Sequence, residues 1–80
     1  MPNRSVWSKK MYEEFVELAM LDEEDQRILL DRIRHVPQAV TADNLGLSIS
    51  TLGRKVKELQ KMYDVACMHS DLLPSGLKII

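Results

Sequence analysis

Basic and hydroxyl-bearing side chains are concentrated between residues 48 and 61 of this chain. Lysine and arginine neutralise nucleic-acid phosphates, and an arginine can donate two parallel hydrogen bonds to the edge of a guanine. These residue types at helical spacing therefore indicate recognition of double-stranded DNA. The candidate DNA-binding residues are Thr41, Ser48, Ser50, Thr51, Gly53, Arg54, Lys55, Lys57 and Lys61.

Three of these candidates are expected to read base edges. Ser50, Arg54 and Lys57 would face outward from a helix that buries Leu52 on its opposite side. Gly53 is an unusual neighbour, because a glycine inside a helix costs about 1 kcal/mol relative to alanine. Two interpretations of it stay open: the missing side chain lets the helix approach DNA closely, or the position is a tolerated surface glycine.

The other candidates are expected to contact phosphate or sugar. They are Ser48, Thr51, Lys55 and Lys61 on the same helix, and Thr41 at the start of the helix before it. The competing interpretation of the basic residues is a solvated helix surface, which is the commoner role of a charged run. These basic residues lie in a pattern typical of a helix-turn-helix motif, and this favours the DNA-binding interpretation.

A helix-turn-helix motif over residues 38–63 would position these side chains. Two helices that cross through a tight turn need a residue that tolerates positive φ and a small side chain near the crossing. Gly46 and Ala42 meet these two needs, and Leu52 and Val56 supply inward apolar positions after the turn.

Two further helices precede the motif, so we expect one compact all-α domain of three to four helices over residues 1–80. The expected helices cover residues 8–20, 22–35, 41–45 and 48–67, with N-caps at Ser8, Asp22, Thr41 and Ser48. The residues expected to face inward include Met11, Phe15, Leu18, Ile28, Leu29, Ile49, Leu52, Val56, Leu59 and Tyr63. Val6 and Trp7 are candidates to staple the first helix, and residues 70–80 form a candidate flexible tail.

The composition limits the class of protein. Eighty residues make one small domain, and 45% apolar with 29% charged residues is typical of a globular chain in water. No apolar run is long enough to span a membrane, and the N-terminus lacks the apolar region of a signal peptide. The single cysteine, Cys67, has no partner for an internal disulfide. We therefore expect a cytoplasmic protein that does not engage membranes.

Other reactive residue types form no convincing site in the sequence. Cys67 and His69 supply too few ligands for zinc, and His35 fits the C-terminal end of a helix. The acidic run 23–25 is explained by the positive N-terminal end of a helix dipole. We therefore expect no metal, no cofactor and no enzymatic activity.

The charge distribution matters more than the total. The net charge is −1, whereas DNA-binding domains are commonly basic. Residues 1–40 carry six Lys or Arg against eight Asp or Glu, and residues 41–63 carry four basic residues against two acidic ones. The basic excess therefore coincides with the motif.

Residues 21–63 resemble region four, the DNA-binding domain of bacterial RNA polymerase sigma factors, and its relatives among response regulators. The resemblance rests on an acidic helix (LDEEDQRILLDRI), a short helix that ends in Leu-Gly (TADNLG) and a serine-capped recognition helix (SISTLGRKVKEL). The whole chain also resembles small helix-turn-helix proteins of bacteriophages and integrative elements. The resemblance implies DNA contacts at Thr41, Ser48, Ser50, Arg54 and Lys57.

The sequence thus predicts a sequence-specific DNA-binding protein that regulates transcription in a phage or mobile element. A module of this size buries only about 600–1,000 Å² on DNA, so a homodimer would help it bind. The candidate dimer surfaces are the first helix, residues 63–68 and the C-terminal segment 77–80 (LKII). The alternative is a protein-interaction module that binds RNA polymerase or a host factor, which the acidic net charge favours.

Overall fold

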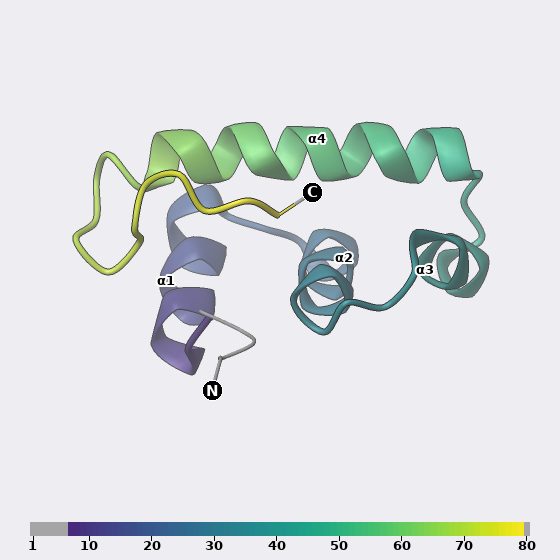
Figure 1. Cartoon of the computed structure of the whole chain (residues 1–80), viewed down its shortest axis with the longest axis horizontal. Helices are drawn as coiled ribbons and strands as arrows, with labels where there is room; N and C mark the ends of the chain where they lie inside the picture. The colour runs from purple at the N-terminus through teal and green to yellow at the C-terminus, as the bar shows by residue number, and fades with distance from the viewer. Residues whose placement is uncertain (1–6, 80) are drawn as a thin grey trace.

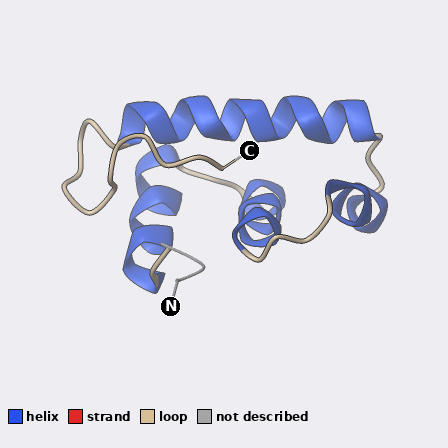
Figure 2. Ribbon diagram, in the orientation of Figure 1, coloured by secondary structure: helices blue, strands red, loops and turns tan. Residues whose placement is uncertain are grey.

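The computed structural model describes residues 7–79, which form four helices. They are α1 (Lys9–Ala19), α2 (Glu23–Ile33), α3 (Gln38–Leu45) and α4 (Ile49–Ala66). α4 lies lengthwise across the other three helices, and the segment after it turns back along it (Figure 1). Within the described residues every regular element is a helix (Figure 2), which confirms the expected all-α fold class.

Three of the helices begin after the N-cap residues that the sequence predicts. Ser8, Asp22 and Ser48 precede α1, α2 and α4, and each side-chain oxygen accepts a hydrogen bond from a backbone N–H three residues later. The donors are Met11 (3.1 Å), Asp25 (2.8 Å) and Thr51 (3.1 Å). These three cap predictions are confirmed.

The third helix begins earlier than predicted. α3 starts at Gln38 with Pro37 as its N-cap, and the Pro37 carbonyl accepts the N–H groups of Val40 (3.0 Å) and Thr41 (3.2 Å). The N-cap prediction for Thr41 is therefore wrong. Proline holds φ near the helical value, here −58°, and has no N–H to satisfy, so the chain enters the helix directly after it.

Three helices are followed, within two residues of their last residue, by a residue with positive φ. A backbone hydrogen bond from the next residue then closes the last turn. The residues are Met20 (φ 54°), His35 (φ 61°) and Gly46 (φ 71°). The next N–H in each case donates to the carbonyl five residues earlier, at 3.1, 2.9 and 2.8 Å. The predicted turn at Gly46 is confirmed, whereas α2 stops at Ile33, short of the predicted His35.

The core is built around α4. Leu52, Val56, Leu59 and Tyr63 each have at most 1% of their surface exposed, and α4 packs against all three other helices. Phe15 of α1 and the pair Ile28 and Leu29 of α2 are fully buried against this row.

Two residues predicted to face inward are exposed instead. Leu18 and Ile49 are 43% and 54% exposed. Ile49 is the first residue of α4, at the end of the packed row, and Leu18 lies at the edge of the apolar side of α1, about 60° around the helix from Phe15.

An aromatic cluster joins the start of the described chain to the end of α4. The rings of Phe15 and Tyr63 meet edge-on with centroids 5.4 Å apart, and Trp7 packs on both at 6.1 and 5.5 Å. The Tyr63 hydroxyl donates to the Pro74 carbonyl at 2.5 Å, and burial raises the pKa of Tyr63 to about 12. Trp7 is therefore partly buried against the core. Its proposed staple partner Val6 lies outside the described residues.

The described part of the segment proposed as a flexible tail, residues 70–79, contacts the core through two buried side chains. Leu73 and Ile79 are only 3% and 5% exposed. The Gln60 side chain of α4 accepts the Ile79 N–H at 2.6 Å and donates to the Leu77 carbonyl at 3.1 Å, while Arg32 of α2 donates to the Ile79 carbonyl at 3.3 Å. Polar contacts with two helices thus hold the segment in place.

Replacing Met20 with glycine is expected to stabilise the protein. Met20 is 87% exposed, and its φ of 54° is strained for a residue that has a Cβ. We expect the free energy of unfolding to rise by about 0.5–1 kcal/mol in urea denaturation. Glu17→Gly is the control, because a glycine inside the helix should lower that free energy by about 1 kcal/mol. Similar losses in both variants would contradict the prediction.

Candidate nucleic-acid interface

The exposed side of α4 carries a row of three basic residues. Arg54, Lys57 and Lys61 are spaced by three and four residues, which puts them on one side of the helix. All three are exposed, and Ser50 extends the row by one turn toward the N-terminus. Arg54, Lys57 and Lys61, called the basic row below, lie opposite the side that buries Leu52, so the packing of α4 directs them into solvent.

The basic row is separate from the ion pairs of the fold. Within residues 7–79 those pairs are Arg27–Asp31 (3.3 Å) and Lys55–Glu24 (3.0 Å), and no member of the row takes part in either. The one acidic residue among its immediate neighbours in sequence is Glu58, which is also exposed. The row therefore presents an excess of positive charge to solvent.

Lys55 lies on the flank of α4 and faces α2. Its Nζ is 3.0 Å from Oε1 of Glu24 in the first turn of α2, and the hydrogen bond to this carboxylate raises the pKa of Lys55. Beside this pair, burial and then the charge of Asp22 raise the pKa of Asp25. Lys55 therefore joins two helices, and the phosphate contact predicted for it would compete with Glu24.

A short turn connects α3 to the start of α4. Gly46 adopts positive φ, Leu47 donates back to Ala42 at 2.8 Å, and the buried Ala42 lies in α3, which packs on α4. Ser48 caps α4, and its hydroxyl also donates to Oγ1 of Thr51 at 2.9 Å. The two hydroxyls proposed for phosphate contact thus lie together at the N-terminus of α4.

Thr41 is in the interior. It is fully buried, and its hydroxyl donates to Oδ2 of Asp31 at 2.8 Å, while Oδ1 of Asp31 pairs with Arg27. The start of α3 at Gln38 puts Thr41 in the second turn, where its side chain points at α2. The hydroxyl is therefore used inside the fold, and we omit Thr41 from the proposed DNA contacts.

Sequence reasoning missed Asp31, which is only 4% exposed. The signal was its position three residues after Ile28, on the side of α2 that also carries the apolar residues. A carboxylate at such a position needs buried partners, because its burial without them is costly. Thr41 and Arg27 are those partners.

Gly53 is in regular helix beside the basic row. A Cβ at this position would have no heavy atom within 4 Å, and the backbone does not require a glycine. The fold therefore gives no internal reason for this residue.

Neither metal-site nor membrane-spanning features occur among residues 7–79. No cluster of three or more His, Cys, Asp or Glu side chains in this range could hold a metal ion. No helix in this range is long and apolar enough to cross a membrane.

Comparison with protein-family models, with curated proteins and with solved structures finds no match to this chain. Within residues 7–79 the structure defines a small all-α domain of four helices.

Replacing Thr41 with valine is expected to destabilise the fold, because Asp31 would lose a buried hydrogen-bond donor. We expect the free energy of unfolding to fall by about 1–3 kcal/mol in urea denaturation. Thr51→Val is the control, since Thr51 is partly exposed and its loss should change that free energy by about 0.5 kcal/mol or less. An effect of Thr41→Val no larger than that of the control would contradict the buried role of Thr41.

Replacing Gly53 with alanine is expected to raise the free energy of unfolding by about 1 kcal/mol, because the helix has room for the methyl group. Gly46→Ala is the matched control: there the positive φ should make alanine destabilising by about 1 kcal/mol. Thermal denaturation of both variants measures the difference. A loss of stability in Gly53→Ala would show that the position is more constrained than the structure indicates.

Proposed function

We propose that this protein binds double-stranded DNA in a sequence-specific manner through α4. The observation that carries the proposal is the exposed basic row on the helix that follows the turn at Gly46. The structure of the turn, the short α3 before it and the burial of the opposite side of α4 all support this reading. We therefore assign α4 as the helix that would enter a major groove.

Roles follow from the position of each residue along α4. The first two turns of a recognition helix present their outer side chains to base edges, which assigns base reading to Ser50 and Arg54, and we assign it also to Lys57 at the start of the third turn. Lys61 lies one turn further along and is assigned to phosphate, with the hydroxyls of Ser48 and Thr51 at the other end. Gly53 lies among these residues and would permit close approach of the helix backbone.

The proposed biological role is regulation of transcription in a phage or mobile element, by analogy with the proteins that the sequence resembles. The competing proposal is a module that binds RNA polymerase or a host factor. The net charge of −1 favours that alternative, because DNA-binding domains are commonly basic. The two proposals differ in whether neutralising the basic row abolishes function.

Arg54→Gln is expected to weaken binding to the preferred duplex and to relax specificity at one base position. A bidentate contact with guanine discriminates by about 1–3 kcal/mol, which is the loss we expect at that position. The site is first selected from a random pool of duplexes, and fluorescence anisotropy then gives the affinity for each single-base variant.

Lys61→Gln is expected to weaken binding to all duplexes alike and to reduce the slope of log affinity against log salt by about 1. Lys10→Gln on α1 is the matched control and should change neither property. If the wild-type chain binds no duplex, the DNA proposal is wrong. Capture of a protein partner that survives replacement of both Arg54 and Lys57 by Gln would favour the competing proposal.

A further inference from the structure

The last described residues of the chain run beside α4, next to the basic row. Gln60 of α4 accepts the Ile79 N–H at 2.6 Å and donates to the Leu77 carbonyl at 3.1 Å. Leu77 is partly buried and Ile79 is buried, whereas Lys78 between them is exposed, an alternation typical of an extended chain. The two hydrogen bonds to its neighbours therefore hold Lys78 beside Gln60 with its side chain in solvent.

This position puts Lys78 close to the basic row. Lys57 precedes Gln60 by three residues, so the two side chains point only about 60° apart around α4. Within residues 7–79, Lys78 takes part in neither of the two ion pairs. The acidic residue bonded to Gln60 is Asp64, one turn further along, whose Oδ1 accepts from the Gln60 amide at 3.0 Å. Lys78 thus adds a positive charge to the flank of α4 that the C-terminal segment covers.

The turn after α2 brings another exposed cation to this flank. The Arg32 guanidinium donates to the carbonyls of Ile79 (3.3 Å) and Val36 (3.2 Å), which joins the C-terminal segment to that turn. The end of the described chain accordingly lies between α4 and α2 (Figure 1). Arg34, the C-cap of α2, is exposed in the same turn. Positive charges from two other parts of the chain therefore stand beside α4 on this flank.

The opposite flank of α4 meets the acidic start of α2. Lys55 points about 140° away from Gln60 around α4, and its Nζ is 3.0 Å from Oε1 of Glu24. The cap and first turn of α2, residues 22–25, carry four carboxylates, and Lys55 pairs with one of them. Carboxylates repel phosphates, so this flank opposes the approach of a DNA backbone.

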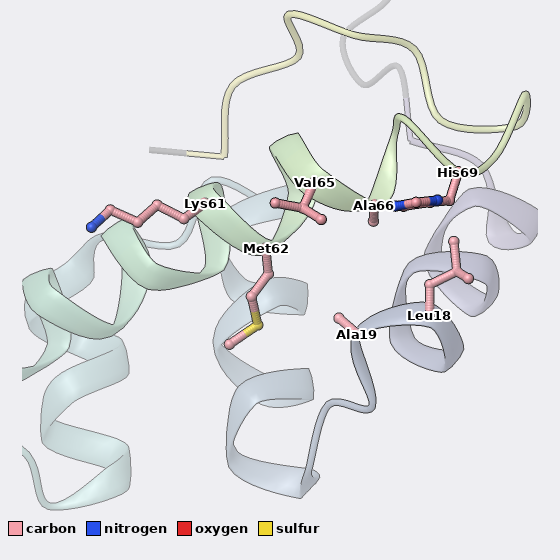
Figure 3. A pocket seen from close by; sticks show the side chains of 7 residues that line it. All are labelled: Leu18, Ala19, Lys61, Met62, Val65, Ala66 and His69. Carbon is pink, nitrogen blue, oxygen red and sulfur yellow. The ribbon is translucent and has the colours of Figure 1, made fainter.

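Nearer the C-terminal end of α4, that same flank borders an apolar groove between α4 and α1. Leu18, Ala19 and Met62 are among the residues that line it, and Figure 3 shows the Lys61 side chain pointing away from them. Met62 follows Gln60 by two residues, so the two side chains point about 160° apart around α4. An apolar surface neutralises no phosphate charge. The flank beside the C-terminal segment is therefore the one that suits a DNA backbone.

We propose that the C-terminal segment forms a second DNA contact, in which Lys78 binds a backbone phosphate at the edge of the major groove that α4 enters. This inference rests on the DNA binding proposed for α4. The major groove is about 12 Å wide and about 8.5 Å deep, so a helix seated in it has a phosphate backbone along each side. One of these backbones would meet Lys78. Such a contact fixes the register of the protein on the duplex, while α4 reads the bases.

Lys78→Gln tests the contact through the salt dependence of duplex binding, measured by fluorescence anisotropy. Each neutralised phosphate contributes about 0.9 to the slope of log affinity against log salt, so the variant should lose about that much slope. The same slope corresponds to about eightfold weaker binding at about 0.1 M salt, for all duplexes alike, and to convergence with the wild type near about 1 M. Lys78→Arg keeps the charge and should keep the wild-type slope. Lys10→Gln on α1 is the matched control, since Lys10 is also an exposed lysine, and should change neither property.

Duplexes with a single uncharged methylphosphonate linkage, moved along each strand in turn, locate the phosphate. We expect one linkage position that weakens binding of the wild type but not of Lys78→Gln, because the variant already lacks the partner of that phosphate. If the wild type binds duplex and Lys78→Gln keeps its slope, or if Lys78→Arg loses as much slope as Lys78→Gln, the second contact is overturned and binding through α4 stands. If the wild type binds no duplex, the proposed DNA function fails and the Lys78 contact fails with it.

Discussion

Burial of one side of α4 is the constraint on which the rest of the structure depends. α1, α2 and α3 all pack against this helix, and its row from Leu52 to Tyr63 is withdrawn from water almost completely. Each large apolar side chain buried in this way contributes about 1.5–3 kcal/mol. The same packing fixes the rotation of α4 about its own axis, so the basic row must face solvent. The stability of the fold and the orientation of the candidate interface therefore have one physical cause.

Polar contacts then set how the smaller helices meet this core. The hydrogen bond from Thr41 to Asp31 joins α3 to α2 inside the protein, and the pair Lys55–Glu24 joins α4 to α2 at its surface. An exposed ion pair contributes only about 0–1 kcal/mol, whereas a buried carboxylate that loses a donor is costly. The buried contact is therefore the stronger determinant of where α3, and with it the turn before α4, is held.

The segment after α4 supplies hydrogen-bond partners for a polar side chain on the buried side of that helix. Gln60 is only 8% exposed, close to the row of apolar residues. Its amide is satisfied by the backbone of residues 77 and 79 and by Asp64. Among residues 7–79 no buried side-chain nitrogen or oxygen is left without a partner. The C-terminal segment thus completes the core in both its apolar and its polar requirements.

The sequence by itself determined the helices, most of their starting residues, the turn at Gly46 and the outward direction of the basic row. These features depend on residues within about four positions of one another, through caps, positive φ and helical period. Only the tertiary structure decided that Thr41 is buried against Asp31, that Lys55 pairs with Glu24, and that the final segment packs on Gln60. In each of these the partner comes from another element of the chain. The helical period places a side chain on one side of its helix, whereas the groups that meet it there are set by how the helices pack.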